Sequence, residues 1–491
     1  MVSSRRQQRK RKLWRSRAAS SDRLGGSTSS VAAGEARRHL VLFGFLLLLL
    51  FVIYNLNLRT ISTDDTFPNR FLPFNLLLDH NPYLDRWIKP LLAQTLGAHG
   101  AYFAAPSHGR LISAYPITTP VFVAPLYVLP AWWLSRHTPP LYPSSPSFYV
   151  AVNTMEKLSA SLIAALSGAV LFLALRKVAS RRVSLGVALI YGLASNTWTI
   201  SSQALWRHGL TELSFAFLLW ALFRSPDARD SAFWAGLALA VASANVPFEA
   251  ILIFPFLLYF GRGPWKNLVL FLAPLVVLGS LVLAYNLYFF AHPLGGYAGR
   301  NLGEAGGAHY SWLARLAIGL PGSLISPSRG LLCYMPWTAF SFWGAARLWK
   351  KNNPGWSRGL MVALAALFLI PVVASDWWAG WCFGPRYATD LLPFLAWFLV
   401  PAWARIGARR VLRWAFGATV ALALWVQVVG AFYYPVGNWD GLPVDVDVAP
   451  ERIWDWSDTQ VLRSWRAGPA PPLLLNQWKT LLKSHPGAPH P

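Results

Sequence analysis

The chain has 491 residues, of which 55% are hydrophobic and only 13% are charged, and it contains 26 Trp. This composition excludes a large soluble protein and indicates a polytopic membrane protein, for which the bilayer is the solvent. The formal net charge is +24, but the basic opening segment 1–38, with its densest run at 5–12, directly precedes the first apolar segment. That position is typical of a topology signal, so we expect membrane lipids and no nucleic acid as partners.

Residues 1–38 are rich in Arg, Lys, Ser and Gln. They have too little apolar surface to offset the entropy of ordering, so we predict a disordered tail. The uncharged run 40–56 follows and lacks a small-residue cleavage pattern, which is typical of a retained membrane anchor. Because positive residues normally hold a helix flank in the cytoplasm, the chain is predicted to start inside and to cross outward.

Further apolar segments predict about eleven crossings in an all-α polytopic membrane protein. Counting each segment once puts every strong basic cluster on the inner side, as expected for cytoplasmic loops. Two short segments meet at Pro247 and predict a tilted or broken pair whose junction faces a cavity. After the first helix, the predicted spans are 157–176, 183–201, 210–224, 232–245, 247–260, 267–290, 331–349, 359–375, 390–404 and 412–433.

The apolar segment 112–134 is a different case, because it carries Pro116, Pro120, Pro125 and Pro130. Proline at this density breaks helical hydrogen bonding. Counting the segment as a crossing would also place the later Arg clusters outside. We therefore predict one or two helices lying at the outer surface.

These expectations define a domain organisation. A basic cytoplasmic tail (1–38) precedes a transmembrane domain (39–434), whose first outer loop covers 57–156, and an outer C-terminal tail (435–491) follows. Loops on a rigid scaffold tend to carry function, so the active site is expected in the outer pieces. Besides the first outer loop and the C-terminal tail, two more outer pieces are expected. They are a Gly-rich loop over 291–330 and a short loop over 376–390. Within the former, 295–307 neither follows a strand nor opens a nucleotide-binding helix, which favours a mobile loop over a phosphate loop.

The acidic pair Asp64 and Asp65 stands a few residues beyond the first helix, at a predicted membrane surface. A carboxylate there can accept the proton of an acceptor hydroxyl or amine, and we interpret both as candidate catalytic residues. A structural role is the alternative, in which Asp64 caps a short helix and Asp65 is a solvated neighbour.

Three phrases in the predicted outer loops carry a family resemblance. They are Asp65-Thr-Phe-Pro-Asn-Arg-Phe-Leu-Pro, His108-Gly-Arg-Leu-Ile-Ser-Ala-Tyr-Pro and Trp377-Trp-Ala-Gly-Trp-Cys-Phe-Gly-Pro-Arg-Tyr-Ala-Thr-Asp390. With the basic anchor and the early loop acids, the chain resembles membrane glycosyltransferases of the GT-C type. Within that type it is similar to the protein O-mannosyltransferase and aminoarabinose transferase group (glycosyltransferase family 39-like). It departs from this group in lacking a Lys-Pro-Pro or His-Pro-Pro element, whose place His108 to Arg110 could occupy.

The resemblance implies transfer of a sugar from a polyprenyl-phosphate donor to a lipid, glycan or protein acceptor on the outer face, with one loop carboxylate as general base. The departing lipid phosphate needs fixed positive charge, which Arg supplies well. Arg386 and Lys157 are favoured because each lies at a predicted helix end, and Arg329 is a further cation. For Arg386 and Asp390, a structural ion pair is the alternative. The substrate-binding candidates are Arg70, His108, Arg110, Glu156, Lys157, Arg207, His208, Arg386 and Asp390.

Glu212 and Glu249 fall in or beside apolar runs, where an ionised group is costly, so they are functional candidates too. No His or Cys pair has the spacing of metal ligands, and we predict no metal site and no certain cofactor. A divalent cation held by the acidic pair and a donor phosphate stays possible. Cys333 and Cys382 are predicted to be unpaired thiols.

Two other functions stay open beside the transferase. A transporter or flippase of lipid-linked sugars would use the same cavity without breaking a bond, but it predicts internal repeats and a polar path through the membrane, which the sequence does not display. The second alternative is a structural membrane subunit that has lost activity. For all three, we expect an integral protein of the cytoplasmic (inner) membrane, with the N-terminus inside and the C-terminus outside.

Overall fold

The computed structural model describes residues 28–92, 102–137, 146–224, 229–296, 312–352, 354–374 and 376–484. Within these ranges the protein is helical apart from a small antiparallel hairpin of β1 (Ala104–Ser107) and β2 (Arg110–Ser113). The all-α prediction is therefore confirmed, with the hairpin as an unexpected addition. Contacts divide the chain into Met1–Leu46 and Leu47–Pro491, and the description below concerns the second unit.

Five described helices are long and apolar enough to cross a membrane, and three shorter apolar helices accompany them. This agrees with a polytopic membrane protein, while the count of about eleven crossings stays a prediction. The long segments are Arg37–Asn55 in α2 (Thr28–Asn55), α6 (Pro146–Leu175), α11 (Trp265–Phe290), Arg386–Ala408 and α18 (Arg410–Phe432). The shorter ones are Pro247–Gly261, α13 (Trp312–Ile325) and Ser357–Val373 in α16 (Ser357–Ala374).

The helix α13 corrects an expectation, because it forms where the sequence suggested a loop through 291–330. Gly319, Pro321 and Gly322 interrupt its apolar run and hide its helical character. Packing explains these glycines: a Cβ atom at Gly322 would lie 2.3 Å from the ring of Trp377. Close contact with the indole therefore requires a residue without a side chain. Most of the stretch 295–307 lies outside the described residues.

Other predicted spans are broken in the structure. The expected helix over 183–201 ends early as α7 (Arg181–Leu193) and is followed by the π-turn η3 (Thr197–Ser201). The expected helix over 331–349 is split near Pro336, since proline lacks the N–H of a regular helix. Its two parts are α14 (Leu331–Tyr334) and α15 (Thr338–Lys351).

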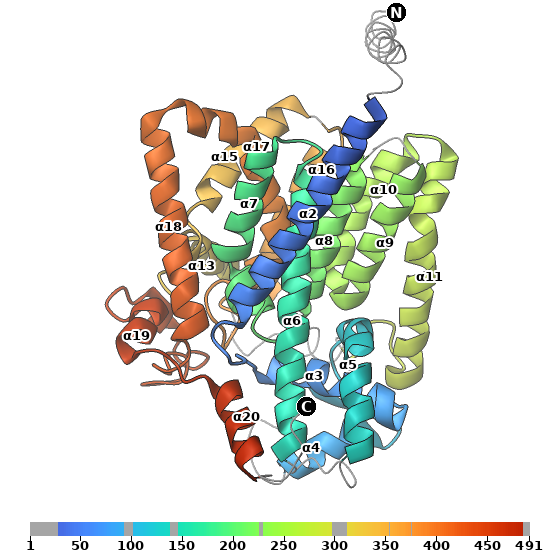
Figure 1. Ribbon diagram of the computed structural model, residues 1–491, viewed down its shortest axis with the longest axis vertical. Helices are drawn as coiled ribbons and strands as arrows, with labels where there is room; N and C mark the ends of the chain where they lie inside the picture. The colour runs from blue at the N-terminus through green and yellow to red at the C-terminus, as the bar shows by residue number, and fades with distance from the viewer. Residues whose placement is uncertain are drawn as a thin grey trace, which may run out of the picture. The chain divides into compact units, whose positions relative to one another are not determined.

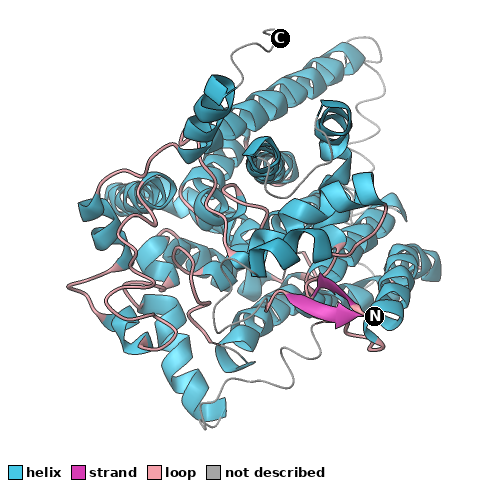
Figure 2. Cartoon of the chain, turned by 90° about the horizontal axis from the view of Figure 1, so that it is seen from below, coloured by secondary structure: helices cyan, strands magenta, loops and turns pink. Residues whose placement is uncertain are grey.

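The first loop folds into short helices at one end of the bundle, where the C-terminal helix α20 (Leu473–Ser484) also lies (Figure 1). The apolar, proline-rich segment forms one helix, α5 (Thr118–His137), with Pro125 and Pro130 inside it. The β-hairpin is at the same end, as the view from below shows (Figure 2). The other elements of the loop are η1 (Asp64–Thr66), α3 (Phe67–Phe74), η2 (Asn75–Asp79) and α4 (Asp85–Leu92).

Close helix packing brings distant segments to this end. The helix α8 (Arg207–Arg224) packs against α6 and α9 (Arg229–Asn245), and α9 packs against α11. A Cβ atom at Gly236 would lie 2.0 Å from the carbonyl oxygen of Phe271, so only glycine permits this approach of α9 to α11. As a result, the start of α8, the end of α9 and η5 (Arg386–Leu391) meet the first-loop helices. The remaining elements are η4 (Pro247–Leu252), α10 (Ile253–Gly261), α17 (Leu392–Ala408), η6 (Pro450–Trp454) and α19 (Gln460–Ala467).

Candidate functional site

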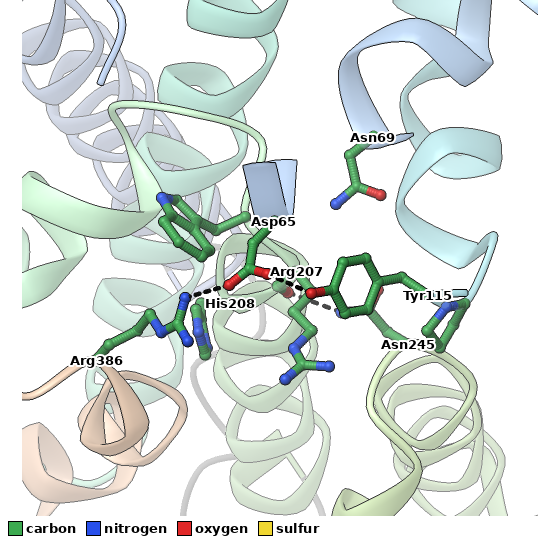
Figure 3. A pocket seen from close by; sticks show the side chains of 9 residues that line it. Asp65, Asn69, Tyr115, Arg207, His208, Asn245 and Arg386 are labelled. Carbon is green, nitrogen blue, oxygen red and sulfur yellow. Dashed lines mark hydrogen bonds and ion pairs between the residues drawn. The ribbon is translucent and has the colours of Figure 1, made fainter. Parts of the chain in front are cut away.

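A small pocket opens where the first-loop helices meet the bundle. Its walls come from η1, α3, the turn before α5, the start of α8, the end of α9 and η5 (Figure 3). Segments from both ends of the chain therefore build one polar site. The lining residues are Asp65, Asn69, Tyr115, Pro116, Trp206, Arg207, His208, Asn245 and Arg386.

Asp65 is the carboxylate that lines this pocket, and both of its oxygens are engaged. Its Oδ2 lies 2.5 Å from NH1 of Arg386, and its Oδ1 accepts a hydrogen bond from the hydroxyl of Tyr115. Figure 3 shows the carboxylate between these two partners, with Arg207 below it. One carboxylate oxygen of Asp65 is therefore ion-paired and the other is hydrogen-bonded.

The two acidic neighbours differ in their affinity for protons. Burial raises the pKa of Asp65, but the charge of Arg386, the hydrogen bonds from Tyr115 and Arg386, and the charge of Arg207 together lower it to about 2. At Asp64, burial raises the pKa first and the charge of Asp65 adds to this, while Arg70 acts in the opposite direction. Asp64 does not line the pocket, so the better base by pKa is not the better-placed one.

Arg386 is held by an aromatic surface as well as by Asp65. Its Cζ atom lies 4.7 Å from the ring centre of Trp206 and 5.6 Å from that of Tyr387, both within cation–π range. Its Nε is buried and has no hydrogen-bond partner among the described residues. The guanidinium is therefore fixed in direction but retains an unused donor.

The residues beside Arg207 are tied to the bundle by hydrogen bonds. His208 Nδ1 lies 2.9 Å from Oδ1 of Asp390, which orients the imidazole in the pocket wall. Asn245 donates to the carbonyl oxygen of Arg207 at 2.7 Å, and its Oδ1 accepts from the hydroxyl of Thr119 at 2.6 Å. Asn245 is at the predicted junction before Pro247, and it does face the pocket.

The structure groups the remaining candidates elsewhere. Glu156 and Lys157 are buried in α6, where Glu156 Oε2 accepts from Ser62 at 2.6 Å and lies 3.7 Å from NH1 of Arg70. Lys157 donates to Oε1 of Gln203 at 2.6 Å. None of these residues lines the pocket.

His108 and Arg110 belong to the β-hairpin and its turn. His108 Nε2 lies 2.9 Å from the carbonyl oxygen of Tyr288, and Arg110 Nε lies 3.3 Å from Oδ2 of Asp85. Neither lines the pocket. Their substrate-binding role therefore stays a prediction without support from proximity to Asp65.

Glu212 and Glu249 are buried within the bundle. Glu212 Oε1 accepts from the hydroxyl of Thr197 at 2.6 Å, whereas Glu249 Oε2 has no hydrogen-bond partner among the described residues. Neither lines the pocket, so a functional role for Glu212 and Glu249 stays a prediction.

Sequence reasoning missed Asn69, Tyr115 and Trp206 as pocket residues. Tyr115 had a local signal, since it is the next-to-last residue of the phrase that begins at His108. Trp206 directly precedes Arg207 and His208. Asn69 is the fifth residue of the phrase that begins at Asp65, but its hydrogen bond to the carbonyl oxygen of Leu205, at 2.8 Å, is a long-range contact that the sequence does not indicate. It fixes α3 beside the segment leading into α8.

No group of three His, Cys, Asp or Glu side chains in the described ranges is arranged to hold a metal ion. A divalent cation at the acidic pair would have to displace Arg386 from Asp65, because that carboxylate is already paired. Cys333 and Cys382 are both free, which confirms the prediction of unpaired thiols.

No protein-family model matches the chain, and no curated protein matches it. Among solved structures, it is similar to the Archaeoglobus fulgidus oligosaccharyltransferase in the apo form, at 12% identity and a TM-score of 0.46, covering 86% of this chain and 60% of that one. The same enzyme tethered with an acceptor peptide containing the NVT sequon has 13% identity and a TM-score of 0.44, covering 86% of this chain and 59% of that one. The archaeal oligosaccharyltransferase AglB from that organism, in complex with an inhibitory peptide and a dolichol-phosphate, has 13% identity and a TM-score of 0.43, covering 87% of this chain and 60% of that one. The chain thus spans about three fifths of their length.

Proposed function

We propose that this protein transfers a sugar from a polyprenyl-phosphate donor to an acceptor at the outer face of the membrane, with Asp65 as general base. The observation that carries the proposal is the pocket itself. A carboxylate lies there between Arg386, Arg207 and Tyr115, beside helices apolar enough to span a bilayer. Such a site combines a proton acceptor with donors for an anionic leaving group.

The reaction would be a single displacement. The acceptor oxygen or nitrogen forms a bond to the anomeric carbon, and the bond from that carbon to the phosphate oxygen breaks, with its electron pair leaving on the phosphate. The acceptor proton passes to Asp65. Arg386 and Arg207 stabilise the leaving phosphate, because guanidinium groups bind phosphate oxygens through charge-assisted hydrogen bonds.

The low pKa of Asp65, which its pairing with Arg386 lowers, bears on the order of steps in this scheme. A carboxylate paired with Arg386 is a weak base, whereas one whose partner has turned to a phosphate becomes a stronger one. Donor binding would therefore both position the sugar and release the base. We expect the donor to bind before the acceptor loses its proton.

The experiment is sugar transfer by purified protein in lipid, with radiolabelled polyprenyl-phosphate sugars as donors and a cell-envelope extract as acceptor. Asp65→Asn should reduce transfer by roughly 10²-fold or more, in the range for a lost general base. Asp64→Asn should retain more activity, because Asp64 does not line the pocket. Asp79→Asn is the matched control, since it removes a loop carboxylate whose partner is Arg86.

The outcomes separate the alternatives. Full activity of Asp65→Asn would remove the base from the proposal, and full activity of both Asp64→Asn and Asp65→Asn would remove the acidic pair. Label that crosses the bilayer without joining an acceptor would identify a flippase instead.

A further inference from the structure

A second charged site lies outside the pocket and is built around Arg59, a residue of the segment between α2 and η1. Only 3% of Arg59 is exposed. Its Nε and NH1 are buried and have no hydrogen-bond partner among the described residues. Burial lowers its pKa and the charge of Tyr434 counteracts this, leaving a pKa of about 10, so the guanidinium is protonated at neutral pH.

Lys157 is a second buried basic residue in this cluster. It is 1% exposed, and the charge of Arg59 acts on it. Its Nζ donates to Oε1 of Gln203 at 2.6 Å, and Nδ2 of Asn57 donates to the same oxygen at 2.6 Å. An amide oxygen has two lone pairs, so these two hydrogen bonds use its full acceptor capacity. The amide is uncharged and therefore does not neutralise a positive charge.

Positive charge exceeds negative charge here. Glu156 is the carboxylate that acts on Lys157, but it also accepts from Ser62 and from the backbone N–H of Leu205, and it pairs with Arg70. One carboxylate therefore serves both Arg70 and Lys157, and Arg59 beside them has no ion pair among the described residues. A buried, uncompensated cation is strongly destabilising, and arginine does not escape this cost by losing its proton.

The C-terminal segment closes this cluster. The backbone N–H of Leu474, in α20, donates to the carbonyl oxygen of Leu58 at 3.1 Å, directly beside Arg59 in the chain. Asn57 Nδ2 donates to the carbonyl oxygen of Ala431 at 2.9 Å. Elements distant in sequence thus surround Arg59, and among the described residues none supplies an acceptor for its buried Nε and NH1.

We propose that Arg59 and Lys157 bind a phosphate-type anion, either free phosphate or the headgroup of an anionic phospholipid, at a site distinct from the Asp65 pocket. The anion supplies acceptors for Arg59 Nε and NH1 and neutralises the excess charge. Gln203 belongs to this cluster, whereas Trp206, three residues later, lines the pocket. The segment between them separates the two sites. This inference does not depend on the transferase proposal.

The test is thermal unfolding of the full-length protein in a zwitterionic detergent and an anion-poor buffer. One arm adds inorganic phosphate, and the other adds mixed micelles containing phosphatidylglycerol. The melting temperature of the wild type should rise with phosphate or with the anionic lipid, because a ligand that binds the folded state stabilises it by mass action. A response to phosphate identifies a free anion as sufficient, and a response to the lipid alone identifies a headgroup.

Arg59→Gln should lose the response, and without the anion it should melt no lower than the wild type, since it removes an unpaired buried charge. If Arg59→Gln does not fold, Lys157→Gln provides the same test. Arg86→Gln, which removes an arginine of the surface pair with Asp79, should respond like the wild type.

The pocket is controlled separately with Arg386→Gln. Retention of the response in this variant supports a distinct site, whether or not sugar transfer is found. Loss of the response in Arg386→Gln together with its retention in Arg59→Gln would place the anion in the pocket and overturn the inference. A wild-type melting temperature that neither additive changes would overturn it as well.

Discussion

Two arginine–aspartate pairs of this protein have the same chemistry but different surroundings. Arg386 and Asp65 line the pocket, with side chains 11% and 22% exposed, whereas Arg329 and Asp440 are 1% and 2% exposed. Arg329 also donates to the carbonyl oxygens of Trp378, Ser328 and Gly380 and to Oε1 of Gln460. Arg386, by contrast, leaves its Nε unused.

The difference distinguishes a structural pair from one available to a ligand. Around Arg329, protein acceptors satisfy the guanidinium and join the loop 376–390 to the C-terminal segment, so a ligand would have nothing to add. Around Arg386, the open side of the pocket and the unused donor leave room for an anion. In the sequence Arg329 was a further candidate cation on the predicted outer side, and its protein partners are what distinguish it from Arg386 in the structure.

Breaking the buried pair should have the largest effect on stability. Arg329→Gln leaves Asp440 buried without its cation, and we expect it to lower the free energy of unfolding by about 3–5 kcal/mol. The measurement is denaturant or thermal unfolding in detergent, with Arg86→Gln as a surface control. A loss as small as that of the control would mean that the network around Arg329 is not structural.

Breaking the pocket pair should instead affect function. Under the proposed reaction, Arg386→Gln removes the charge that would face the donor phosphate. We expect transfer to fall by about 10²-fold, the order for a lost electrostatic donor in an active site. Arg386→Lys should recover part of this loss, since it restores charge without the planar fork. The assay is donor-dependent transfer, with KM and kcat measured separately, alongside unfolding. Greater destabilisation by Arg386→Gln than by Arg329→Gln would reverse the assignment of the two pairs.

The smallest expected effect is a difference in pH dependence between the two acids. The pKa of Asp65 is lowered to about 2 from an ordinary 3.8, so its contribution of about 2 kcal/mol is present above pH 4 and is lost as the pH falls toward 2. Burial raises the pKa of Asp440 above its ordinary value, with Arg329 opposing this. Protonation on acidification therefore favours the folded state at Asp440 and the unfolded state at Asp65.

Two variants measure this contrast. Unfolding is followed as a function of pH for the wild type, Asp65→Asn and Asp440→Asn. The difference between wild type and Asp65→Asn should shrink toward pH 2, whereas the difference for Asp440→Asn should have the opposite slope with pH. Slopes of the same sign would mean that the two carboxylates have equivalent environments.

The sequence by itself determined the class of protein and indicated some of the residues that line the candidate pocket. Its apolar segments predict a helical membrane protein, because a bilayer requires long stretches of apolar residues whose backbone groups are paired within a helix. The acidic pair after the first helix, the Arg207–His208 step and the Arg386 phrase all carry local signals, and these residues do meet, apart from Asp64, in one pocket.

Only the tertiary structure decided which charges face one another. Tyr115 is 50 residues from Asp65 and Arg386 is 321 residues from it, yet both bind the same carboxylate. The same holds for Arg59, which is a single basic residue without a distinguishing pattern in the sequence. Once the C-terminal segment lies beside it, its buried Nε and NH1 have no hydrogen-bond partner among the described residues. The physical reason is that helix formation depends on local pattern, whereas burial and charge pairing depend on contacts between segments far apart in the chain.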